Sequence, residues 1–545
     1  MSSKLRIVPL GGCGEIGKNM TVIEYGDEMV IVDAGIMFPE NDMLGIDYII
    51  PDYQYIMDKR EKIKAVLITH GHEDHVGALP HLMEDVDAPI YATPLTLGLI
   101  EVKLREAGLL QQVSLKKIQA GFNFRVGQFN VEPFHVAHSI PDCVGYGITT
   151  PVGLIVHTGD YKFDHTPVDG WPPDFAKLAE FSQRGVLALL ADSTNADRKG
   201  WTPSEMVIND AFEDLFRDAQ GRIIIASFAS LISRIQQVVN MAQKFDRKLA
   251  ITGRSMRKNT KMARELGYLD LPEEMLIDIY DLDKYPDSKV VIMATGSQGE
   301  PGAVLGRLAT GRHRHLSVKE GDTVVLSAHP IPGNEEMIHR IINRLFQRGA
   351  NVLYDQIVDV HVSGHASADE MKLMINLVRP KFMIPVHGEL RHLKLHAKMA
   401  AELGIPEQNM AVVENGTILE LDEHSLKVGE RIPGGYIYVQ GASVGDIGPA
   451  VIRDREVLSD SGFVVVVLET NDEGNVIGRP EFVTRGFADH RDSEDLFKGA
   501  EEAVMRAVRK YRDNQKQVNG KVADSLSRYL YQETGRRPLV QALVK

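Results

Sequence analysis

The sequence predicts a multidomain α/β protein in which one domain is interrupted by an inserted one. The chain has 545 residues, and at roughly 150 residues per domain this length favours three or four domains or sub-domains. Short apolar runs that end in polar residues fill the first 200 residues. The same pattern returns after residue 350. In the stretch between, the apolar runs are typical of buried strands separated by helices.

In the first region, the apolar runs are the candidate strands. They are MVIVDAG (29–35), KAVLITHGH (64–72), GLIVHTGD (153–160) and VLALLADS (186–193). Each run places polar residues directly after its apolar part. Because a strand is rigid and its end opens to solvent, we expect catalytic side chains at these ends.

The second region contains RIIIASF, KLAITG, KVVIMATG and TVVLSA, which are typical of buried parallel strands separated by helices such as 233–245. HVSGH (361–365) and KFMIPVHGE (381–389) then resume the first pattern. The predicted domains are 1–202 with 351–425, an inserted domain at 203–350, a linker at 426–455, and a C-terminal domain at 456–545.

The C-terminal residues predict a small α/β domain. A strand at 463–469 precedes a helix whose apolar residues, from Leu496 to Tyr511, recur three or four positions apart. A second amphipathic stretch surrounds Leu526 and Leu530, and a strand ends the chain. This domain carries no chemical motif, so we expect it to serve packing or dimerisation.

Composition excludes several classes of protein. Hydrophobic residues make up 43% and charged residues 25% of the chain, which is typical of a soluble globular protein. The two cysteines, Cys13 and Cys143, give no disulfide framework. Neither a signal peptide nor an apolar run of about 20 residues is found. We expect a cytoplasmic protein with no membrane partner.

The formal charge of −14 argues against nucleic-acid binding through net charge alone. Two runs without acidic residues, 253–264 and 306–319, nevertheless lie in the predicted inserted domain. Residues 257, 261 and 264 would place three cations on one helical face. These runs predict a basic strip that guides a single nucleic-acid strand.

The strongest chemical motif is HGHEDH, which places His70, His72, Asp74 and His75 directly after a predicted strand. Imidazole and carboxylate groups are the ligands of Zn²⁺. The motif therefore predicts a metal site, in which His70 and His72 serve one ion while Asp74 and His75 reach a second.

Further ligands must come from other strand ends. His138, Asp160 and His387 each follow an apolar run and are candidates. His135, three residues before His138, is an alternative to it.

Together with ADSTNA (191–196), TGSQGEPG (295–302), HVSGHAS (361–367) and PVHGE (385–389), the motif resembles the metallo-β-lactamase superfamily and, within its β-CASP branch, bacterial ribonuclease J. The resemblance covers nearly the whole chain. It implies a metallo-β-lactamase αββα sandwich interrupted by an inserted β-CASP α/β domain, followed by a small C-terminal α/β domain.

The resemblance also implies the ligand sets of two zinc ions. His70, His72 and His138 would hold one zinc, Asp74, His75 and His387 the other, and Asp160 would bridge them. Asp33 would orient ligands. Asp192, in the first β-CASP motif, would lie near the metals. Imidazole and carboxylate ligands also suit Mn²⁺.

The implied activity is that of a zinc-dependent ribonuclease with 5′-to-3′ exonuclease and endonuclease action on single-stranded RNA. It would serve RNA maturation, including that of rRNA, and mRNA decay. A pair of zinc ions would supply a hydroxide that attacks phosphorus, and His365 would protonate the leaving 3′-oxygen. A homodimer or homotetramer, a paralogue partner or an RNA-decay complex are further implications.

We expect a pocket that binds the 5′-monophosphate of the RNA. The resemblance places this pocket at His361, Val362, Ser363, Gly364 and His365. The hydroxyls of Ser227 and Ser230, in SFASLISR (227–234), are of the kind that line such a pocket.

Three alternatives remain at this stage. GCGEIG (12–17) with Asp33 fits a dinucleotide-binding turn, although 20–28 predicts a strand and hairpin instead of a crossover helix. A metallo-β-lactamase-type thioesterase or lactonase would lack the inserted domain. A non-catalytic RNA-binding scaffold would keep the fold without the activity.

Overall fold

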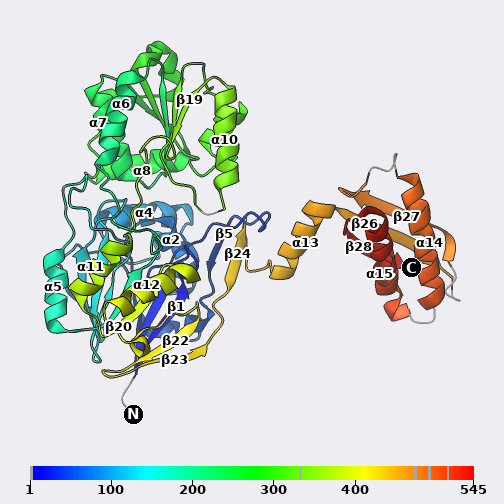
Figure 1. Ribbon diagram of the computed structural model, residues 1–545, viewed down its shortest axis with the longest axis horizontal. Coiled ribbons are helices and arrows are strands. Elements are labelled where there is room, and N and C mark those ends of the chain that lie inside the picture. The colour runs from blue at the N-terminus through cyan, green and yellow to red at the C-terminus, as the bar shows by residue number, and fades with distance from the viewer. Residues whose placement is uncertain (1–3, 332, 472–475, 489–492, 512–514, 545) are drawn as a thin grey trace. The chain divides into compact units, whose positions relative to one another are not determined.

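The computed structural model describes residues 4–331, 333–471, 476–488, 493–511 and 515–544 (Figure 1). It forms two compact units. The first comprises Met1–Phe38 and Ile49–Ile437, and the second comprises Pro39–Tyr48 and Tyr438–Lys545. None of the helices in these described ranges is both long and apolar enough to cross a membrane.

Two stacked sheets form the base of the first unit. The eight-stranded sheet has the order β23 (Leu426–Arg431), β22 (Thr417–Leu421), β1 (Leu5–Gly11), β3 (Met20–Tyr25), β4 (Glu28–Val32), β6 (Ile63–Leu67), β7 (Ile90–Ala92) and β8 (Leu115–Lys117). The six-stranded sheet has the order β20 (Phe382–Val386), β13 (Val186–Asp192), β12 (Leu154–His157), β11 (Val144–Thr149), β10 (Phe129–His135) and β9 (Phe124–Val126). Apolar side chains of both sheets pack between them, among them Ile7, Val32, Val131 and Ile384.

Helices cover the outer face of each sheet. Helices α3 (Leu79–Asp85) and α4 (Pro94–Glu106) pack on the eight-stranded sheet. Helices α5 (Phe175–Arg184), α11 (Ala368–Val378) and α12 (Leu390–Glu402) pack on the six-stranded one. The predicted αββα sandwich is confirmed.

Five of the predicted strands with polar residues at their ends are present, whereas HVSGH (361–365), expected to repeat this pattern, lies in a loop. Strand β4 ends directly before Asp33, and β6 ends three residues before His70. Strand β12 ends three residues before Asp160, β13 ends at Asp192, and β20 ends directly before His387.

The glycine-rich turn near the N-terminus does not lead into a crossover helix. Strands β3 and β4 pair antiparallel, with Tyr25 opposite Glu28, so only a tight hairpin turn separates them. A dinucleotide-binding unit requires a helix at this point. The hairpin predicted from the sequence is confirmed, and the dinucleotide alternative is excluded.

The inserted domain is built on six parallel strands. Their order is β16 (Leu276–Ile277), β15 (Lys248–Ile251), β17 (Val290–Ala294), β14 (Ile223–Ala226), β18 (Thr323–Leu326) and β19 (Asn351–Tyr354). Helices α6 (Val207–Asp218), α7 (Ile232–Lys244) and α8 (Arg254–Glu265) pack on one face. Helices α9 (Val304–Thr310) and α10 (Glu335–Gln347) pack on the other.

Two predicted boundaries differ from the observed elements. Strand β19 pairs with β18, so the inserted sheet continues past residue 350. The stretch 426–455, expected to be a linker, contains β23, β24 (Tyr436–Gln440), β25 (Ser443–Val444) and the start of α13 (Pro449–Ser461). A tight turn at Asp422, whose carboxylate accepts the backbone N–H groups of His424 and Ser425, directs β23 back along β22.

The end of the chain folds as predicted, into an α/β layer. Strand β26 (Phe463–Thr470) lies between β27 (Val476–Arg485) and β28 (Leu539–Val544). Helices α14 (Glu494–Tyr511) and α15 (Gln515–Thr534) pack on one face of this sheet.

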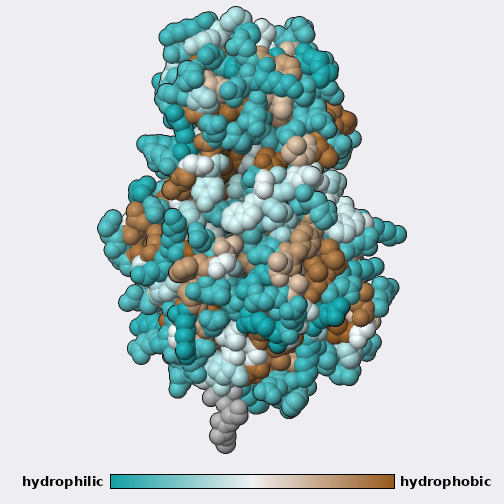
Figure 2. All heavy atoms as spheres, turned by 90° about the vertical axis from the view of Figure 1, so that its left-hand side faces the viewer, coloured by the Kyte–Doolittle hydropathy of each residue, from teal (hydrophilic) through white to brown (hydrophobic). Residues whose placement is uncertain are grey.

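Figure 2 shows one face of the protein, on which hydrophilic residues predominate. Apolar residues form small separate groups there. Among the described residues on that face, no large continuous apolar patch of the kind found at permanent interfaces is seen.

Candidate metal centre

The HGHEDH motif forms the turn between β6 and a short helix, α2 (Glu73–Val76). His70 and His72 lie in the turn, whereas Asp74 and His75 lie in the first turn of the helix. The backbone N–H of His75 bonds to the carbonyl of His72. This turn folds the four side chains back toward the strand ends that carry the remaining candidates.

The first cluster contains His70, His72 and His138. His72 Nδ1 lies 3.1 Å from His70 Nε2 and 3.1 Å from His138 Nε2. Nitrogen atoms that bind one tetrahedral ion at 2.0–2.1 Å lie about 3.3 Å apart, so both of these distances are close to that spacing. The other candidate, His135, lies elsewhere: its Nδ1 faces the Pro172 carbonyl at 3.0 Å, and its ring stacks on Trp171.

The second cluster contains Asp74, His75, Asp160 and His387. His75 Nε2 lies 3.1 Å from Asp160 Oδ2 and 3.5 Å from Asp74 Oδ2, while His387 Nε2 lies 3.4 Å from Asp74 Oδ2. The φ angle of His387 is +51°, in the left-handed region that non-glycine residues rarely adopt. Such strained backbone is often retained at functional sites.

Asp160 connects the two clusters. Its Oδ2 atom lies 3.1 Å from His75 Nε2 in one cluster, and 3.6 Å from His70 Nε2 and 3.7 Å from His138 Nε2 in the other. Its Oδ1 atom accepts a hydrogen bond from His387 Nδ1–H at 2.8 Å. A single carboxylate oxygen therefore faces both sets of ligand atoms.

Asp33 orients one imidazole of each cluster. His75 Nδ1–H donates to Asp33 Oδ2 at 2.8 Å. The Thr69 hydroxyl donates to the same oxygen at 2.9 Å and lies 3.0 Å from His70 Nδ1. These contacts leave Nε2 of His70 and of His75 facing the clusters, which is the arrangement that metal-binding histidines adopt.

The two clusters differ in electrostatics. Burial lowers the pKa of His70 and His138 well below the ordinary value and that of His72 to about 4, so these rings are neutral. Burial would raise the pKa of Asp74 and Asp160, but the neighbouring imidazoles, foremost His75 and His387, outweigh it and hold both well below the ordinary value.

The imidazoles of the second cluster shift in the opposite direction. Burial lowers the pKa of His75 and His387, yet Asp160 and the other carboxylates outweigh burial and raise it, to about 10 for His387. The second cluster thus stabilises positive charge at its centre.

These residues fit a pair of divalent ions. Neutral imidazoles present lone pairs to one point, and a carboxylate-rich set stabilises positive charge at the next. His387 Nε2 is also buried and makes no hydrogen bond, its charged neighbour Asp74 Oδ2 lying 3.4 Å away, as expected of an atom that faces a further ligand. A metallo-β-lactamase fold implies a divalent metal, and the structure supplies a suitable donor set for it.

His365 and Asp192 lie beside the second cluster. His365 Nδ1–H donates to Asp192 Oδ2 at 2.8 Å, and Asp192 Oδ1 accepts from the backbone N–H and hydroxyl of Thr194. The side chain of His365 is 20% exposed. Burial lowers its pKa, but Asp192 and Asp160 outweigh burial and raise it above the ordinary value.

The predicted phosphate segment, 361–365, is a loop attached to the first cluster. His138 Nδ1–H donates to the Gly364 carbonyl at 2.7 Å. A Cβ atom on Gly364 would lie 2.6 Å from the His138 ring, so only glycine allows this approach. Val362 is buried, and Nδ1 of His361 is buried without a partner. Burial and the nearby Arg234 lower the pKa of His361 well below the ordinary value.

The predicted serines are only partly brought to this loop. Ser363 Oγ accepts from Asn195 Nδ2 at 2.8 Å and is part of the loop. Ser227 and Ser230 follow β14 at the carboxyl edge of the inserted sheet. The Ser227 hydroxyl donates to the carbonyl of Phe228, which is ordinary turn chemistry.

Sequence reasoning missed several residues that hold the site. Asn195 Nδ2 donates to Ser363 Oγ and to the His365 carbonyl at 3.1 Å. Thr69 links Asp33 to His70. Both residues lie inside or beside the quoted motifs, so their position was the available signal. Arg234 is the last residue of the quoted segment SFASLISR (227–234), but its burial depends on partners distant in the sequence.

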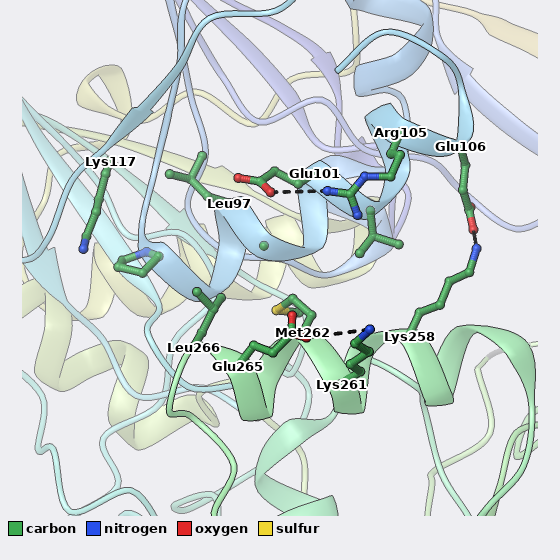
Figure 3. A pocket seen from close by; sticks show the side chains of 13 residues that line it. Leu97, Glu101, Arg105, Glu106, Lys117, Lys258, Lys261, Met262, Glu265 and Leu266 are labelled. Atoms are coloured by element: carbon green, nitrogen blue, oxygen red, sulfur yellow. Dashed lines mark hydrogen bonds and ion pairs between the residues drawn. The ribbon is translucent and has the colours of Figure 1, made fainter. Parts of the chain in front are cut away.

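Most cations of the first basic run, 253–264, form ion pairs with acidic residues. It forms α8, as the spacing predicted, and α8 packs on α4, where Gly98 leaves room for the side chain of Met262. Lys258 pairs with Glu106 and Lys261 with Glu265 beside a cavity of about 680 Å³ (Figure 3). Arg264 pairs with Glu273, so of this run only Arg254 and Arg257 show no ion pair within the described chain.

The second basic run does not face the metal centre. Its residues 312–319 precede β18, whose first residue, Thr323, is paired with the first residue of β14. They therefore lie at the amino edge of the parallel sheet, opposite the edge that carries Ser227. The expectation that both runs guide a strand over the metals is not supported by this placement.

Four protein families match consecutive parts of the chain. They are the metallo-beta-lactamase superfamily (13–194), the ribonuclease J beta-CASP domain (220–345), the Zn-dependent metallo-hydrolase RNA specificity domain (351–410) and the ribonuclease J C-terminal domain (450–545).

Three named relatives align with this chain over nearly their whole length. Ribonuclease J 1 of Streptococcus pyogenes serotype M3 is 43% identical over 99% of this chain and 98% of its own length. Ribonuclease J2 of Bacillus subtilis is 41% identical, with coverage of 100% and 99%. Ribonuclease J of Thermus thermophilus is 43% identical, with coverage of 99% and 95%.

One solved structure, a protein of unknown function from Enterococcus faecalis V583, matches 77% of this chain and 100% of its own with a TM-score of 0.54 and 15% identity, which concerns the fold alone. The domain matches and the full-length relatives confirm the resemblance found in the motifs. The chain belongs to the ribonuclease J family.

Proposed function

We propose that this protein is a zinc-dependent ribonuclease that hydrolyses single-stranded RNA at a two-metal site, acting from the 5′ end and also internally. Membership in the ribonuclease J family supports a metal-dependent ribonuclease. The observation that carries the two-metal proposal is Asp160 Oδ2, which lies within 3.1–3.7 Å of imidazole nitrogens from both clusters.

In this proposal, His70, His72 and His138 would hold one ion, Asp74, His75 and His387 would hold the other, and Asp160 would serve both. When bound, the ions supply positive charge for the phosphate oxygens and lower the pKa of water for attack on phosphorus. Asp33 keeps the ligand nitrogens aimed inward. Mn²⁺ is compatible with the same donors.

His365 is the proposed proton donor to the leaving 3′-oxygen. Its Nδ1–H is held by Asp192, so Nε2 remains available to carry the transferred proton. The loop 361–365 is the proposed site for a terminal 5′-phosphate, because Ser363 and the unpartnered Nδ1 of His361 lie there beside the metal centre. Arg254 and Arg257 are the remaining candidates for contacts to the RNA backbone.

The experiment is digestion of one 5′-labelled single-stranded RNA with a 5′-monophosphate, with product sizes resolved over time. We expect mononucleotide release from the 5′ end together with internal fragments, both lost with a chelator and restored by Zn²⁺ or Mn²⁺. RNA that remains intact with metal-loaded protein would contradict the proposal. The RNA-specificity match at 351–410 favours RNA over a thioester or lactone substrate.

A further inference from the structure

Arg234 is a fully buried cation outside the metal centre. It lies in α7 and is 1% exposed. Its Nε donates to Gln237 Oε1 at 2.8 Å and its Nη2 to Glu205 Oε2 at 2.9 Å. Its Nη1 donates to the Val360 carbonyl at 2.6 Å and to the hydroxyl oxygen of Ser327.

Two of these acceptors, Glu205 and Val360, come from the places where the inserted domain begins and ends. Glu205 lies just before α6, on the chain that enters the inserted domain. Ser327 follows β18, and Val360 lies on the chain that leaves the domain after β19. The Ser327 hydroxyl also donates to the Val360 carbonyl at 2.8 Å. Two donors of the inserted domain thus hold the carbonyl directly before His361.

The far side of the same loop is held by the metal-bearing domain. Asn195 Nδ2 bonds to Ser363 Oγ and to the His365 carbonyl, and His138 bonds to the Gly364 carbonyl. The loop 361–365 is therefore fixed at its start by Arg234 and beyond its middle by Asn195 and His138. Its position depends on both domains.

Packing alone does not explain a buried arginine, because burial of its charge is unfavourable in free energy. Removing the guanidinium from water is compensated here by Glu205, yet a well-packed apolar residue often does as well for stability. The planar guanidinium group donates several hydrogen bonds in fixed directions, so it holds several acceptors in defined positions at once.

We infer that Arg234 is a positioning residue for recognition of the RNA 5′ end: by holding the Val360 carbonyl it places His361 and Ser363 for contact with a terminal phosphate. This inference rests on the proposed function of the loop. It assigns Arg234 no contact with the RNA.

The test compares Arg234→Lys with a matched control, Arg222→Lys. Arg222 is also buried, pairs with Asp322 and donates to the Ser317 carbonyl, but it lies at the opposite edge of the same sheet. The measurement is kcat/KM on 5′-monophosphate and on 5′-hydroxyl RNA of one sequence. The ratio compared is kcat/KM for the 5′-monophosphate RNA divided by kcat/KM for the 5′-hydroxyl RNA. We expect Arg234→Lys to lower this ratio about tenfold, as for a lost hydrogen bond of a charged group, and Arg222→Lys to leave it unchanged.

Ser327→Ala provides a milder variant, because it removes one donor to the Val360 carbonyl and keeps the ion pair. It should lower the same ratio about threefold, and it decides the question if Arg234→Lys does not fold. A wild-type ratio retained by both variants, or an equal fall in Arg222→Lys, would overturn the inference alone. A wild-type enzyme with no preference for the monophosphate would overturn the proposed end recognition as well.

Discussion

Replacement of Asp33 by asparagine should weaken metal binding without disturbing the backbone. Asp33 has a φ of +63°, which asparagine also tolerates, so the change is confined to the side chain. In the protein as it stands, Oδ2 accepts from both His75 Nδ1–H and the Thr69 hydroxyl. An amide NH₂ group at that point would favour the opposite tautomer of His75, with a hydrogen on Nε2 where the ion must bind.

These contacts set the expected loss of metal affinity and of folding stability in Asp33→Asn. Loss of an outer partner of a metal-binding histidine costs about 10–100-fold in metal affinity, and Asp33 serves His75 directly and His70 through Thr69. Each buried donor left without its acceptor also costs about 1–3 kcal/mol. We expect the free energy of unfolding of the metal-free protein to fall by about 2–4 kcal/mol.

The assay is competition between metal-free protein and a chromogenic chelator, with denaturant unfolding alongside. Asp422→Asn is the control, because Asp422 also accepts several hydrogen bonds, from His424 and Ser425, but in an exposed turn. Metal affinity in Asp33→Asn equal to that of the control variant would refute the assigned role of Asp33.

Three further changes test the site. His72→Ala and Asp74→Ala should each leave about one bound ion and no cleavage, and near-normal turnover in either would refute the ligand assignment. His365→Ala should keep its metal but lose about 10²–10⁴-fold in kcat; a rate within threefold of wild type would exclude it as the proton donor. Ser363→Ala should reduce the preference for 5′-monophosphate over 5′-hydroxyl RNA in a paired kinetic assay, and an unchanged preference would remove Ser363 from the end pocket.

Much of the fold and of the candidate site could be predicted because the informative residues are local. HGHEDH places four donors within six residues, and the remaining candidates each follow a strand. The two stacked sheets then bring their strand ends together, so His138, Asp160 and His387, which follow strands of the six-stranded sheet, meet the motif that follows β6 of the other. The residues alone left His135 as an alternative to His138; His135 is the last residue of β10, and its ring faces Pro172 and Trp171 outside the cluster.

What could not be predicted depends on partners distant in the sequence. Arg234 lies in an amphipathic helix, where an arginine is usually solvated; its burial follows from Glu205 and Val360, which lie far from it along the chain. The basic run at 253–264 contains no acid, yet Glu106 and Glu273 neutralise part of it from other elements. Glycine and proline between 426 and 455 indicated a linker, whereas pairing with β22 makes a strand of its first residues.

The most direct test of the two-metal site is the metal content of the purified, untagged protein, determined by elemental analysis before and after chelation. The arrangement around Asp160 predicts two divalent ions per chain, with RNA cleavage lost as they are removed and recovered as two are returned. Protein that contains no such ion, takes none up, and still cleaves RNA in the presence of the chelator would contradict it.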